Sequence, residues 1–483
     1  MNRAAVYELL SGAGHVQDND RKRLSPDELC TRVRQLAKQL VANNARVVGI
    51  DLPNGADWIV ADLACAMAGV TCIPLPPFFT NAQRAHLAAL TGMGHEVGSD
   101  GLRKRDVVPD VSASEAGRGG PAKITFTSGT TGTPKGVPLS MQAQLRVAGS
   151  LAGVTRDLEL RRHLCLLPLA VLLENVAGVY ASMLSGAELL LPPPSRSGLR
   201  GSSGFDADTL LDTLRQEQPD SLILLPQMLK LLVAHLERSR SRVDGLRFVA
   251  VGGARTAPGL LLKARAVGLP VFEGYGLSEC ASVVCLNHPG ADLPGSVGKP
   301  LPHVRLRISA TGEIEVRLDE SVDGDGEDGP ATWLGTGDIG ALDSNGFVHV
   351  QGRAKQILIT SYGRNVSPEW IESELLGEPA IAQAMVVGDD QPGLAALVVT
   401  APGVSSGALT RAVERVNERL PDYARVGRFR RVEPFTPANG QLTANGRLRR
   451  DNILVAHAKV IDFLYRLLQE PTTDEQQGGT QSH

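Results

Sequence analysis

The chain contains one short segment whose residue types are suited to binding a polyphosphate. The stretch TFTSGTTGTPKG spans residues 125–136 and contains no acidic residue. Its glycines let the backbone turn tightly and approach a ligand without obstruction by a Cβ atom. Hydroxyl and free backbone N–H groups can donate hydrogen bonds to phosphate oxygens, and Lys135 adds a mobile positive charge. The glycines are Gly129, Gly132 and Gly136, and the hydroxyl-bearing residues are Thr127, Ser128, Thr130, Thr131 and Thr133.

This segment does not follow the Walker pattern GxxxxGK[ST]. Pro134 stands where the second glycine belongs, and Gly136 stands where the Ser or Thr belongs. Composition alone is also typical of a flexible surface linker. Because the segment has a single lysine and no acidic residue, we expect a phosphate loop of another kind, with the linker as the alternative.

Alternating apolar runs and amphipathic segments predict the framework around this loop. The runs RVVGIDL, HLCLLPL, SLILLP, LRFVAVGG and PVFEGYG are separated by helical patterns. Such alternation favours βαβ units and an α/β fold rather than a sandwich or a helix bundle. Gly252, Gly253 and Ala254 directly follow one expected strand, at the kind of position where open parallel sheets place their ligands.

The chain is long enough for more than one hydrophobic core. We predict a large N-terminal domain of layered α/β subdomains over residues 1–352. The pattern restarts with strands at QILIT, AMVVGD and LAALVVT and helices at SPEWIESELLG and TRAVERVNERL, which predicts a smaller α+β domain over 353–468. The tail, 469–483, has too little apolar content to fold and is predicted to be disordered.

Composition excludes several classes of protein. A net charge of -3 offers no field for nucleic acid or anionic lipid, and the apolar runs are interrupted too often to span a membrane. The six cysteines form no CxxC pair and no zinc-like spacing with histidine. No signal peptide is evident at the start, so a cytoplasmic location is expected.

The acidic stretch 319–331 lacks the glutamate of a calcium loop and is interpreted as a solvated turn.

Five motifs in order resemble those of the AMP-forming acid ligases, the superfamily of acyl-CoA synthetases, peptide-synthetase adenylation domains and luciferases. TSGTTGTPKG resembles the phosphate loop of that superfamily. EGYGLSEC (273–280) and WLGTGDIG (333–340) resemble its second and third signatures. GRAKQILITSYGRNVSPEWIE (352–372) resembles the hinge region, and LTANGRLRR (442–450) lies where the C-terminal lysine motif falls. The resemblance implies the adenylate-forming fold, with a mobile C-terminal domain.

The resemblance also implies a role for individual residues in binding ATP and Mg²⁺. Tyr275 would stack on the purine, although alone it is equally typical of a core tyrosine, and Asp338 would accept hydrogen bonds from the ribose hydroxyls. Glu279 would hold the magnesium ion, since Mg²⁺ prefers one or two carboxylates plus substrate phosphates. Lys135 would be a catalytic cation at the phosphates, and Arg353 would reach ribose or phosphate from the domain junction. The remaining implied nucleotide contacts are Thr127, Ser128, Gly129, Thr130, Thr131, Gly132, Gly253, Ala254, Gly274, Gly276 and Ser278, the last in place of the usual threonine.

Two further positions are implied to serve motion and thiol access. Lys355 would be the hinge between the two domains, although a lone lysine is more often a solvated surface residue. Gly363 would lie in a loop that lines the thiol channel.

The sequence departs from the family pattern at two places. The C-terminal motif usually carries a catalytic lysine, but position 447 is Arg, whose planar fork is not equivalent to an ammonium group. Arg449 and Arg450 are candidate substitutes. In LPLAVLLEN (167–175), Val171 stands where a His or aromatic residue usually gates the acyl pocket.

Val171, Leu172 and Gly252 are therefore predicted to line an altered acyl pocket. No Asp in 167–175 can pair with an α-ammonium group, and a buried ammonium without a partner is costly. The pocket is predicted to take an aromatic or aliphatic acid and not an amino acid.

The resemblance predicts an ATP-dependent ligase that forms an acyl-AMP and passes the acyl group to the thiol of CoA or of a carrier-protein phosphopantetheine. Arg447 keeps other interpretations open: a relative that stops at the acyl-adenylate or forms a β-lactone, or a non-catalytic acyl- or nucleotide-binding homologue. GLSEC around Ser278 approaches a hydrolase GxSxG but has Cys280 in place of the last glycine.

Overall fold

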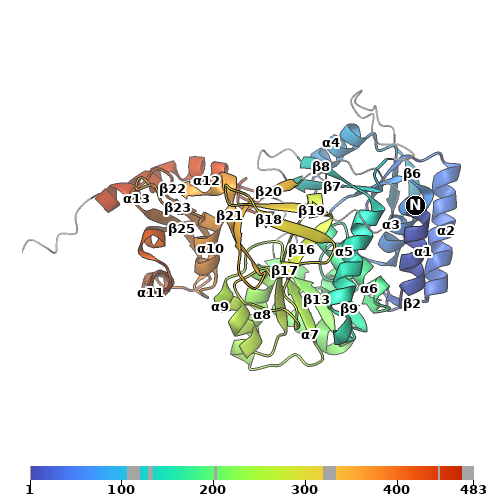
Figure 1. The fold of residues 1–483 in the computed structure, drawn as a ribbon, viewed down its shortest axis with the longest axis horizontal. Helices are drawn as coiled ribbons and strands as arrows, with labels where there is room; N and C mark the ends of the chain where they lie inside the picture. Colours follow the sequence, from blue (N-terminus) through green and yellow to red (C-terminus); the bar gives the residue numbers. More distant parts are fainter. Residues whose placement is uncertain are drawn as a thin grey trace, which may run out of the picture. The chain divides into compact units, whose positions relative to one another are not determined.

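The computed structural model describes residues 2–105, 120–128, 134–200, 204–318, 333–443 and 446–469 (Figure 1). Contacts within the chain group it into two compact units. The larger unit comprises Met1–Thr336 and Gly340–Val350, and the smaller comprises Gly337–Ile339 and Gln351–His483. The domain boundary at 352/353 stays a prediction, and the tail predicted to be disordered lies outside the described residues from 470 onward.

Two extended sheets form the framework of the larger unit, each with parallel pairing in its centre and antiparallel strands at its edges. One sheet is nine-stranded, in the order β17 (Lys299–Pro300), β16 (Ser282–Leu286), β15 (Val271–Leu277), β14 (Phe248–Val251), β13 (Ser221–Leu224), β9 (Arg162–Leu164), β10 (Glu188–Leu190), β1 (Val16–Gln17) and β2 (Arg23–Leu24). The other is six-stranded, in the order β6 (Gly101–Lys104), β5 (His95–Gly98), β3 (Val47–Ile50), β4 (Thr71–Pro74), β7 (Lys123–Ser128) and β8 (Pro134–Leu139).

The central strands are short, continuous apolar runs because helices cover both faces of a parallel sheet. Every residue of β3, β4 and β13 is buried. The helices of the larger unit are α1 (Asn2–Gly12), α2 (Pro26–Ala42), α3 (Ala56–Ala68), α4 (Asn81–Thr91), α5 (Met141–Val154), α6 (Ala181–Leu184), α7 (Ala207–Glu217), α8 (Pro226–Ser239) and α9 (Pro258–Ala266), with a π-helix at Leu173–Tyr180. No helix among the described residues is both long and apolar enough to cross a bilayer.

Local sequence signals set several helix boundaries. The side chain of Ser25 accepts a hydrogen bond from the backbone N–H of Glu28, and Glu28 reaches back to Ser25, which forms a capping box at α2. Asp206 caps α7 by accepting from the N–H of Thr209 at 3.2 Å. The proline at the first position of α8 supplies the φ angle that a first turn needs.

An antiparallel sheet and a small three-layered unit follow the parallel sheets. The antiparallel sheet has the order β18 (Val304–Ile308), β19 (Glu313–Leu318), β20 (Leu334–Leu342) and β21 (Val348–Arg353). The smaller unit contains the sheet β24 (Ile381–Val387), β25 (Leu394–Thr400) and β26 (Val426–Arg431), the hairpin β22 (Leu358–Ile359) and β23 (Asn365–Val366), and helices α10 (Pro368–Leu376), α11 (Ser406–Arg419), α12 (Arg450–Ala456) and α13 (Ala458–Gln469). The layered α/β fold with a smaller α+β part is as the sequence predicted.

A buried ion pair anchors the base of β7, the strand that leads to the predicted phosphate loop. Lys123 is 2% exposed, and its Nζ lies 3.0 Å from Oδ1 of Asp62 on α3. The ammonium group also donates to Oδ1 of Asn175, and the hydroxyl of Tyr180 donates to Asp62 Oδ2 at 2.6 Å. Both charges are therefore satisfied in the interior, where an unpaired charge would be strongly destabilising.

Glu273 is a second buried acid, at the point where β15 leaves the apolar core. It is 4% exposed, and its Oε1 accepts from the backbone N–H of Thr256 at 3.0 Å. Burial raises the pKa of this carboxyl from its usual value to about 7, against the opposing effects of Thr256 and the Arg255 charge. Glu273 is therefore partly protonated at neutral pH.

The buried pair leads to a prediction about stability. Replacing Asp62 by Ala leaves Lys123 charged and without its carboxylate, so Asp62→Ala should lower the free energy of unfolding by about 3–5 kcal/mol. Urea unfolding followed by circular dichroism measures this loss. Glu159→Ala is the control, because Glu159 pairs with Arg161 on the surface, with the two side chains 69% and 81% exposed. Equal losses in the free energy of unfolding for Asp62→Ala and Glu159→Ala would contradict the claim that burial makes the Asp62–Lys123 pair more costly to break than a surface pair.

The raised pKa of Glu273 predicts a pH dependence. The native state binds the proton more tightly than the unfolded state, so this group's contribution to stability falls as pH rises from the unfolded carboxyl range through about 7. Glu273→Gln removes that loss, and its stability advantage over the wild type should grow between pH 5 and 7, by at most about 3 kcal/mol, and then level off. Thermal unfolding at each pH measures it. The exposed Glu237→Gln should show no such trend, and a constant difference for Glu273→Gln would refute the prediction.

Candidate active site

The structure describes the two strands that flank the predicted phosphate loop. β7 and β8 pair antiparallel, with Thr127 opposite Lys135 and Ser128 opposite Pro134. The two strands thus hold the ends of the loop beside each other. Gly129, Thr130, Thr131 and Gly132 lie outside the described residues, so their expected phosphate contacts stay predictions. Lys135 is exposed at the start of β8.

Gly136 has a packing role in addition to the freedom expected of it from the sequence. A Cβ atom at this position would lie 3.0 Å from Ile124 Cγ2 and 3.1 Å from the ring of Phe126. Both contacts are tighter than ordinary van der Waals packing. The glycine therefore lets β8 pass close over the side chains of β7.

Parallel pairing brings together two segments that are 22 positions apart in the sequence. β14 and β15 run side by side with Val251 opposite Glu273, so the Gly252–Ala254 turn lies beside Gly274. A Cβ atom on Gly252 would be 3.4 Å from the carbonyl oxygen of Gly274. Gly253 has φ +84, a backbone conformation that favours glycine. These turns occupy the carboxyl edge of the sheet, where ligands bind in open α/β folds.

Tyr275 lies at a bulge in the following hairpin. The pairing of β15 with β16 shifts between Tyr275 and Gly276. A Cβ atom on Gly276 would lie 1.9 Å from the carbonyl oxygen of Ser282, so only glycine fits there. Tyr275 is half-buried and packs against the cluster that includes Cys280 and Val284. Its ring is held in place by this packing, and its stacking on a purine stays a prediction.

Glu279 is an exposed acid next to the strand that carries Lys135. It lies in the short 3₁₀ turn η4 (Ser278–Cys280), which contacts β8. Burial and the Glu279 charge raise the pKa of the neighbouring Cys280 thiol to about 12, so this cysteine stays neutral. Within the described residues Glu279 forms no ion pair. An exposed, uncompensated carboxylate beside a phosphate-loop strand fits the needs of a magnesium ion that also binds substrate phosphates.

Asp338 and Arg353 form an ion pair within the smaller unit. Arg353 Nε lies 2.9 Å from Asp338 Oδ1, and the side chains are 46% and 7% exposed. Gly337, at φ +73, precedes the aspartate. The carboxylate expected to bind ribose therefore already has a guanidinium partner, and the sequence did not reveal this pairing.

Arg447 belongs to the same charged neighbourhood. Although the residue as a whole is exposed, desolvation of the guanidinium lowers its pKa, and the Arg353 charge lowers it further. Glu369 and Asp338 oppose this shift. Arginine keeps its charge throughout, because its pKa in water is above 12. Four groups that are distant in sequence thus interact electrostatically around position 447.

Arg450, one of the two predicted substitutes for a catalytic lysine, has a structural role. Its guanidinium pairs with the buried carboxylate of Glu372 and donates to the carbonyl of Val386. Burial raises the pKa of Glu372, and the Arg450 charge opposes that rise. Arg450 therefore stabilises the interior of the smaller unit. The backbone of Arg449 donates to the carbonyl of Gln441 at 2.9 Å and accepts from the N–H of Ile453 at 3.0 Å.

Val171 and Leu172, two of the three residues predicted to line the acyl pocket, differ in burial. Val171 is half-buried, whereas Leu172 is 8% exposed and packs in the main hydrophobic core. They are followed directly by the π-helix, Leu173–Tyr180. The buried side chains of Glu174 and Asn175 in this helix were not anticipated from the sequence.

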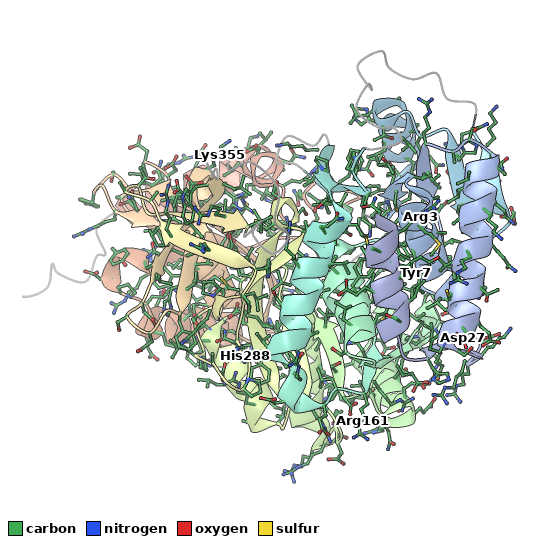
Figure 2. All side chains as sticks on the ribbon, turned by 45° about the vertical axis from the view of Figure 1, so that its right-hand side comes forward. Arg3, Tyr7, Asp27, Arg161, His288 and Lys355 are labelled. Atoms are coloured by element: carbon green, nitrogen blue, oxygen red, sulfur yellow. The ribbon has the colours of Figure 1, made fainter. Side chains whose placement is uncertain are left out.

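Lys355 and Gly363 both lie on the surface of the smaller unit. Lys355 is exposed in the 3₁₀ turn η5 (Ala354–Gln356), as Figure 2 shows. Gly363 has φ +71, and its N–H donates to the carbonyl of Thr360 at 2.8 Å in the turn between β22 and β23. The hinge and thiol-channel roles stay predictions.

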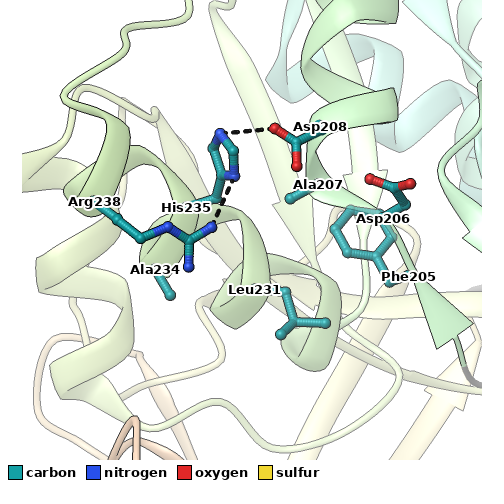
Figure 3. A pocket seen from close by; sticks show the side chains of 8 residues that line it. All are labelled: Phe205, Asp206, Ala207, Asp208, Leu231, Ala234, His235 and Arg238. Carbon is teal, nitrogen blue, oxygen red and sulfur yellow. Dashed lines mark hydrogen bonds and ion pairs between the residues drawn. The ribbon is translucent and has the colours of Figure 1, made fainter. Parts of the chain in front are cut away.

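A surface pocket of about 390 Å³ lies between α7 and α8 (Figure 3). In it, His235 Nε2 is 3.3 Å from Asp208 Oδ1, and Arg238 donates to His235 Nδ1 at 3.3 Å. None of its lining residues belongs to the five motifs. The pocket is therefore separate from the candidate site.

Comparison with known proteins identifies the same family that the motifs resemble. The AMP-binding enzyme family matches residues 2–111 and 95–324, and the C-terminal domain of AMP-binding enzymes matches 355–469. A long-chain-fatty-acid–CoA ligase of Mycobacterium bovis is 27% identical over 71% of this chain and 69% of its own. A 2-succinylbenzoate–CoA ligase of Bacillus subtilis is 27% identical over 83% of this chain and 88% of its own.

Solved structures agree on the fold. The o-succinylbenzoate CoA synthetase of Bacillus subtilis, in complex with its acyl-adenylate intermediate, has a TM-score of 0.73 at 24% identity and covers 93% of this chain and 97% of its own. The anthranilate CoA ligase AuaEII, in complex with anthranoyl-AMP, has a TM-score of 0.76 at 19% identity and covers 95% and 98%. The adenylate-forming fold predicted from the motifs is confirmed, and the chain belongs to the AMP-binding enzyme family.

Proposed function

We propose that the protein activates a carboxylic acid with ATP as an acyl-AMP, releases pyrophosphate and transfers the acyl group to the thiol of CoA. The observation that carries this proposal is the contact between β8, with Lys135, and the η4 turn, with Glu279. This contact supports a site in which a cation and a carboxylate act together next to the predicted phosphate loop. Matches to both domain models of AMP-binding enzymes, and relatives that are CoA ligases, support the same chemistry.

The first step joins the acid to the α-phosphate of ATP. A carboxylate oxygen attacks the α-phosphorus, and the bond to pyrophosphate breaks, so negative charge builds up on the leaving group. Lys135 lies where it can stabilise that charge, and Glu279 would hold a magnesium ion, which supplies further positive charge to the phosphates. The turn at Gly252–Ala254 and the end of β15 beside it, Gly274–Gly276, would offer backbone groups to the nucleotide.

The second step transfers the acyl group. The thiol sulfur attacks the acyl carbon, the bond to the phosphate oxygen breaks, and AMP leaves. The curated relatives named above are CoA ligases, so we assign CoA as the acceptor. The phosphopantetheine of an acyl carrier protein offers the same thiol and is the alternative acceptor. A cytoplasmic location, where ATP and CoA are available, belongs to the same proposal.

The acid itself is assigned by class only. Val171 is half-buried and apolar, and no Asp lies in the segment that carries it. An aromatic or aliphatic acid without an α-amine fits such a wall, whereas an ammonium group would be left without a partner. Screening acids for AMP release with CoA tests this assignment, and a best substrate that is an amino acid would contradict it.

Glu279 provides a test of the first step. Glu279→Gln keeps the size of the side chain but removes the negative charge, so acid-dependent exchange of labelled pyrophosphate into ATP should fall about 10²-fold or more. Excess Mg²⁺ should restore part of the rate. Glu237→Gln, an exposed change on α8, should leave exchange unaltered. Exchange at the wild-type rate in Glu279→Gln would remove this residue from the mechanism.

Arg447 and Lys355 test whether the two steps use separate domain arrangements. Arg447→Ala should slow pyrophosphate exchange by about 10-fold or more, because a charge near the α-phosphate is lost. Lys355→Pro fixes φ near −65° and should restrict rotation, so thioester formation should fall much further than exchange. Single-turnover assays of each half-reaction measure both effects.

Arg411→Ala is the control, since it removes an exposed guanidinium from α11 (Ser406–Arg419), outside the five motifs. It should leave both half-reactions near the wild-type rate. Equal losses in both half-reactions for Arg447→Ala and Lys355→Pro would mean that the steps share one domain arrangement.

A further inference from the structure

The backbone of Leu167–Leu172, called the LPLAVL segment below, is held by two polar side chains from different elements. Asn54 Nδ2 donates to the carbonyl of Leu167 at 2.8 Å, and Asn54 Oδ1 accepts from the N–H of Leu169 at 2.8 Å. Glu174 Oε2 accepts from the N–H of Leu167 at 2.9 Å. Three backbone groups of this irregular segment are therefore fixed by side chains and not by a regular ladder.

Glu174 is itself fixed from the sheet below it. It has no exposed surface, and its Oε1 lies 3.1 Å from Nε2 of His163 on β9. His163 Nδ1 lies 3.0 Å from the hydroxyl of Ser221, which is the residue opposite it on β13. With the proton on Nε2, the imidazole donates to the carboxylate and accepts from the serine. A chain of hydrogen bonds thus runs from two central strands to the LPLAVL segment.

The space around this carboxylate depends on one glycine. A Cβ atom on Gly178 would lie 2.3 Å from Glu174 Oε1 and 2.9 Å from His163 Nε2. Both distances are too short for any alanine to be accepted without displacing the two side chains. Gly178 and Glu174 both belong to the π-helix Leu173–Tyr180, a form that is rare and frequently found at functional sites.

A second set of side-chain bonds attaches the π-helix to α3. The side chains of Asn175 and Tyr180 bond to Asp62, which in turn pairs with Lys123 at the base of β7. The backbone N–H of Asn175 also donates to the carbonyl of Val171 at 3.1 Å, whereas Tyr180 reaches Asp62 through its side chain. Tyr180 therefore offers a control for any general effect of disturbing the π-helix.

We propose that Asn54 and Glu174 are positioning residues for the acid substrate: they fix the LPLAVL segment so that Val171 forms a rigid wall of the acyl pocket. This inference rests on the proposed function, because it needs an acid that binds against Val171. Each residue acts through the backbone and does not touch the reacting atoms. Rigid placement of a substrate wall matters because small displacements reduce the population of reactive geometries.

Asn54→Ala is the first test, since Asn54 is half-buried at the surface and its loss should not prevent folding. The variant loses two hydrogen bonds to the segment. The KM for the acid in pyrophosphate exchange should rise about 10-fold, while the KM for ATP should change less than about 2-fold. A general loss of stability would not separate the two constants in this way.

Glu174 and Gly178 provide the second test. Glu174→Ala should raise the KM for the acid. Glu174→Gln should have a KM close to that of the wild type, because its amide can still accept from the N–H of Leu167 and donate to the other tautomer of His163. Gly178→Ala should raise the same constant by displacing the carboxylate. Gly153→Ala on α5 is its matched control, since a Cβ atom there meets nothing within 4 Å.

Tyr180→Phe separates positioning from stability. It removes the 2.6 Å bond to Asp62 and should lower the melting temperature, but the ratio of the two KM values should stay that of the wild type. A change of this ratio in Tyr180→Phe as large as that in Asn54→Ala would overturn the inference. So would an unchanged KM for the acid in both Asn54→Ala and Glu174→Ala.

Two further outcomes are distinguishable from these. His163, Cys165 and Glu174 have ligand atoms within 4.8 Å of one another, so one equivalent of zinc in the purified protein, lost in Glu174→Ala, would replace the hydrogen-bonded network and overturn the inference. A wild-type protein that shows no acid-dependent exchange would refute the proposed function itself. Exchange in the wild type without the KM split would refute only the positioning role.

Discussion

The parallel pairing of β13, β14 and β15 is the constraint on which the candidate site depends. Parallel strands end at the same edge of a sheet, so the turns that follow them must meet there. The register that pairs Val251 with Glu273 therefore brings the Gly252–Ala254 turn next to Gly274, and it does not depend on the conformation of the connecting segment. Glycine is needed at position 276 because the carbonyl oxygen of Ser282 would lie only 1.9 Å from a Cβ atom there.

Buried polar groups attach the irregular parts to this sheet. The π-helix packs apolar side chains into the core, but its Glu174 and Asn175 carry hydrogen bonds in two directions. One set of bonds fixes the LPLAVL segment, and the other reaches Lys123 below the phosphate loop. Because each buried charge or amide must be satisfied, moving Glu174 disturbs His163 on β9, and moving Asn175 disturbs Lys123 on β7. The fixed position of the LPLAVL segment follows from this requirement more than from apolar packing, which is not directional.

Much of the site could be predicted from the sequence because its motifs are local. Short strands followed by glycine turns, such as VAVGGA and EGYG, specify both the framework and the ligand edge. The pair of Asp62 with Lys123 joins residues 61 positions apart, and that of Asp62 with Asn175 joins residues 113 apart. Hydrophobic periodicity along the sequence does not indicate which distant polar residues will pair. The same holds for Glu174, which stands in an apolar run that has the pattern of any buried helix, and for the antiparallel sheet from β18 to β21.

The arginine at position 447 is best understood through its neighbours. Desolvation and the Arg353 charge both lower the pKa of a cation at this position, and only Glu369 and Asp338 oppose them. A lysine ammonium starts from a pKa of about 10.4 and has less margin before it loses its proton, whereas a guanidinium starts above 12. Arginine thus keeps a permanent positive charge where lysine would be closer to neutrality. Its planar fork can donate two parallel hydrogen bonds, so Arg447 differs from the family's usual lysine in donor geometry while preserving the positive charge.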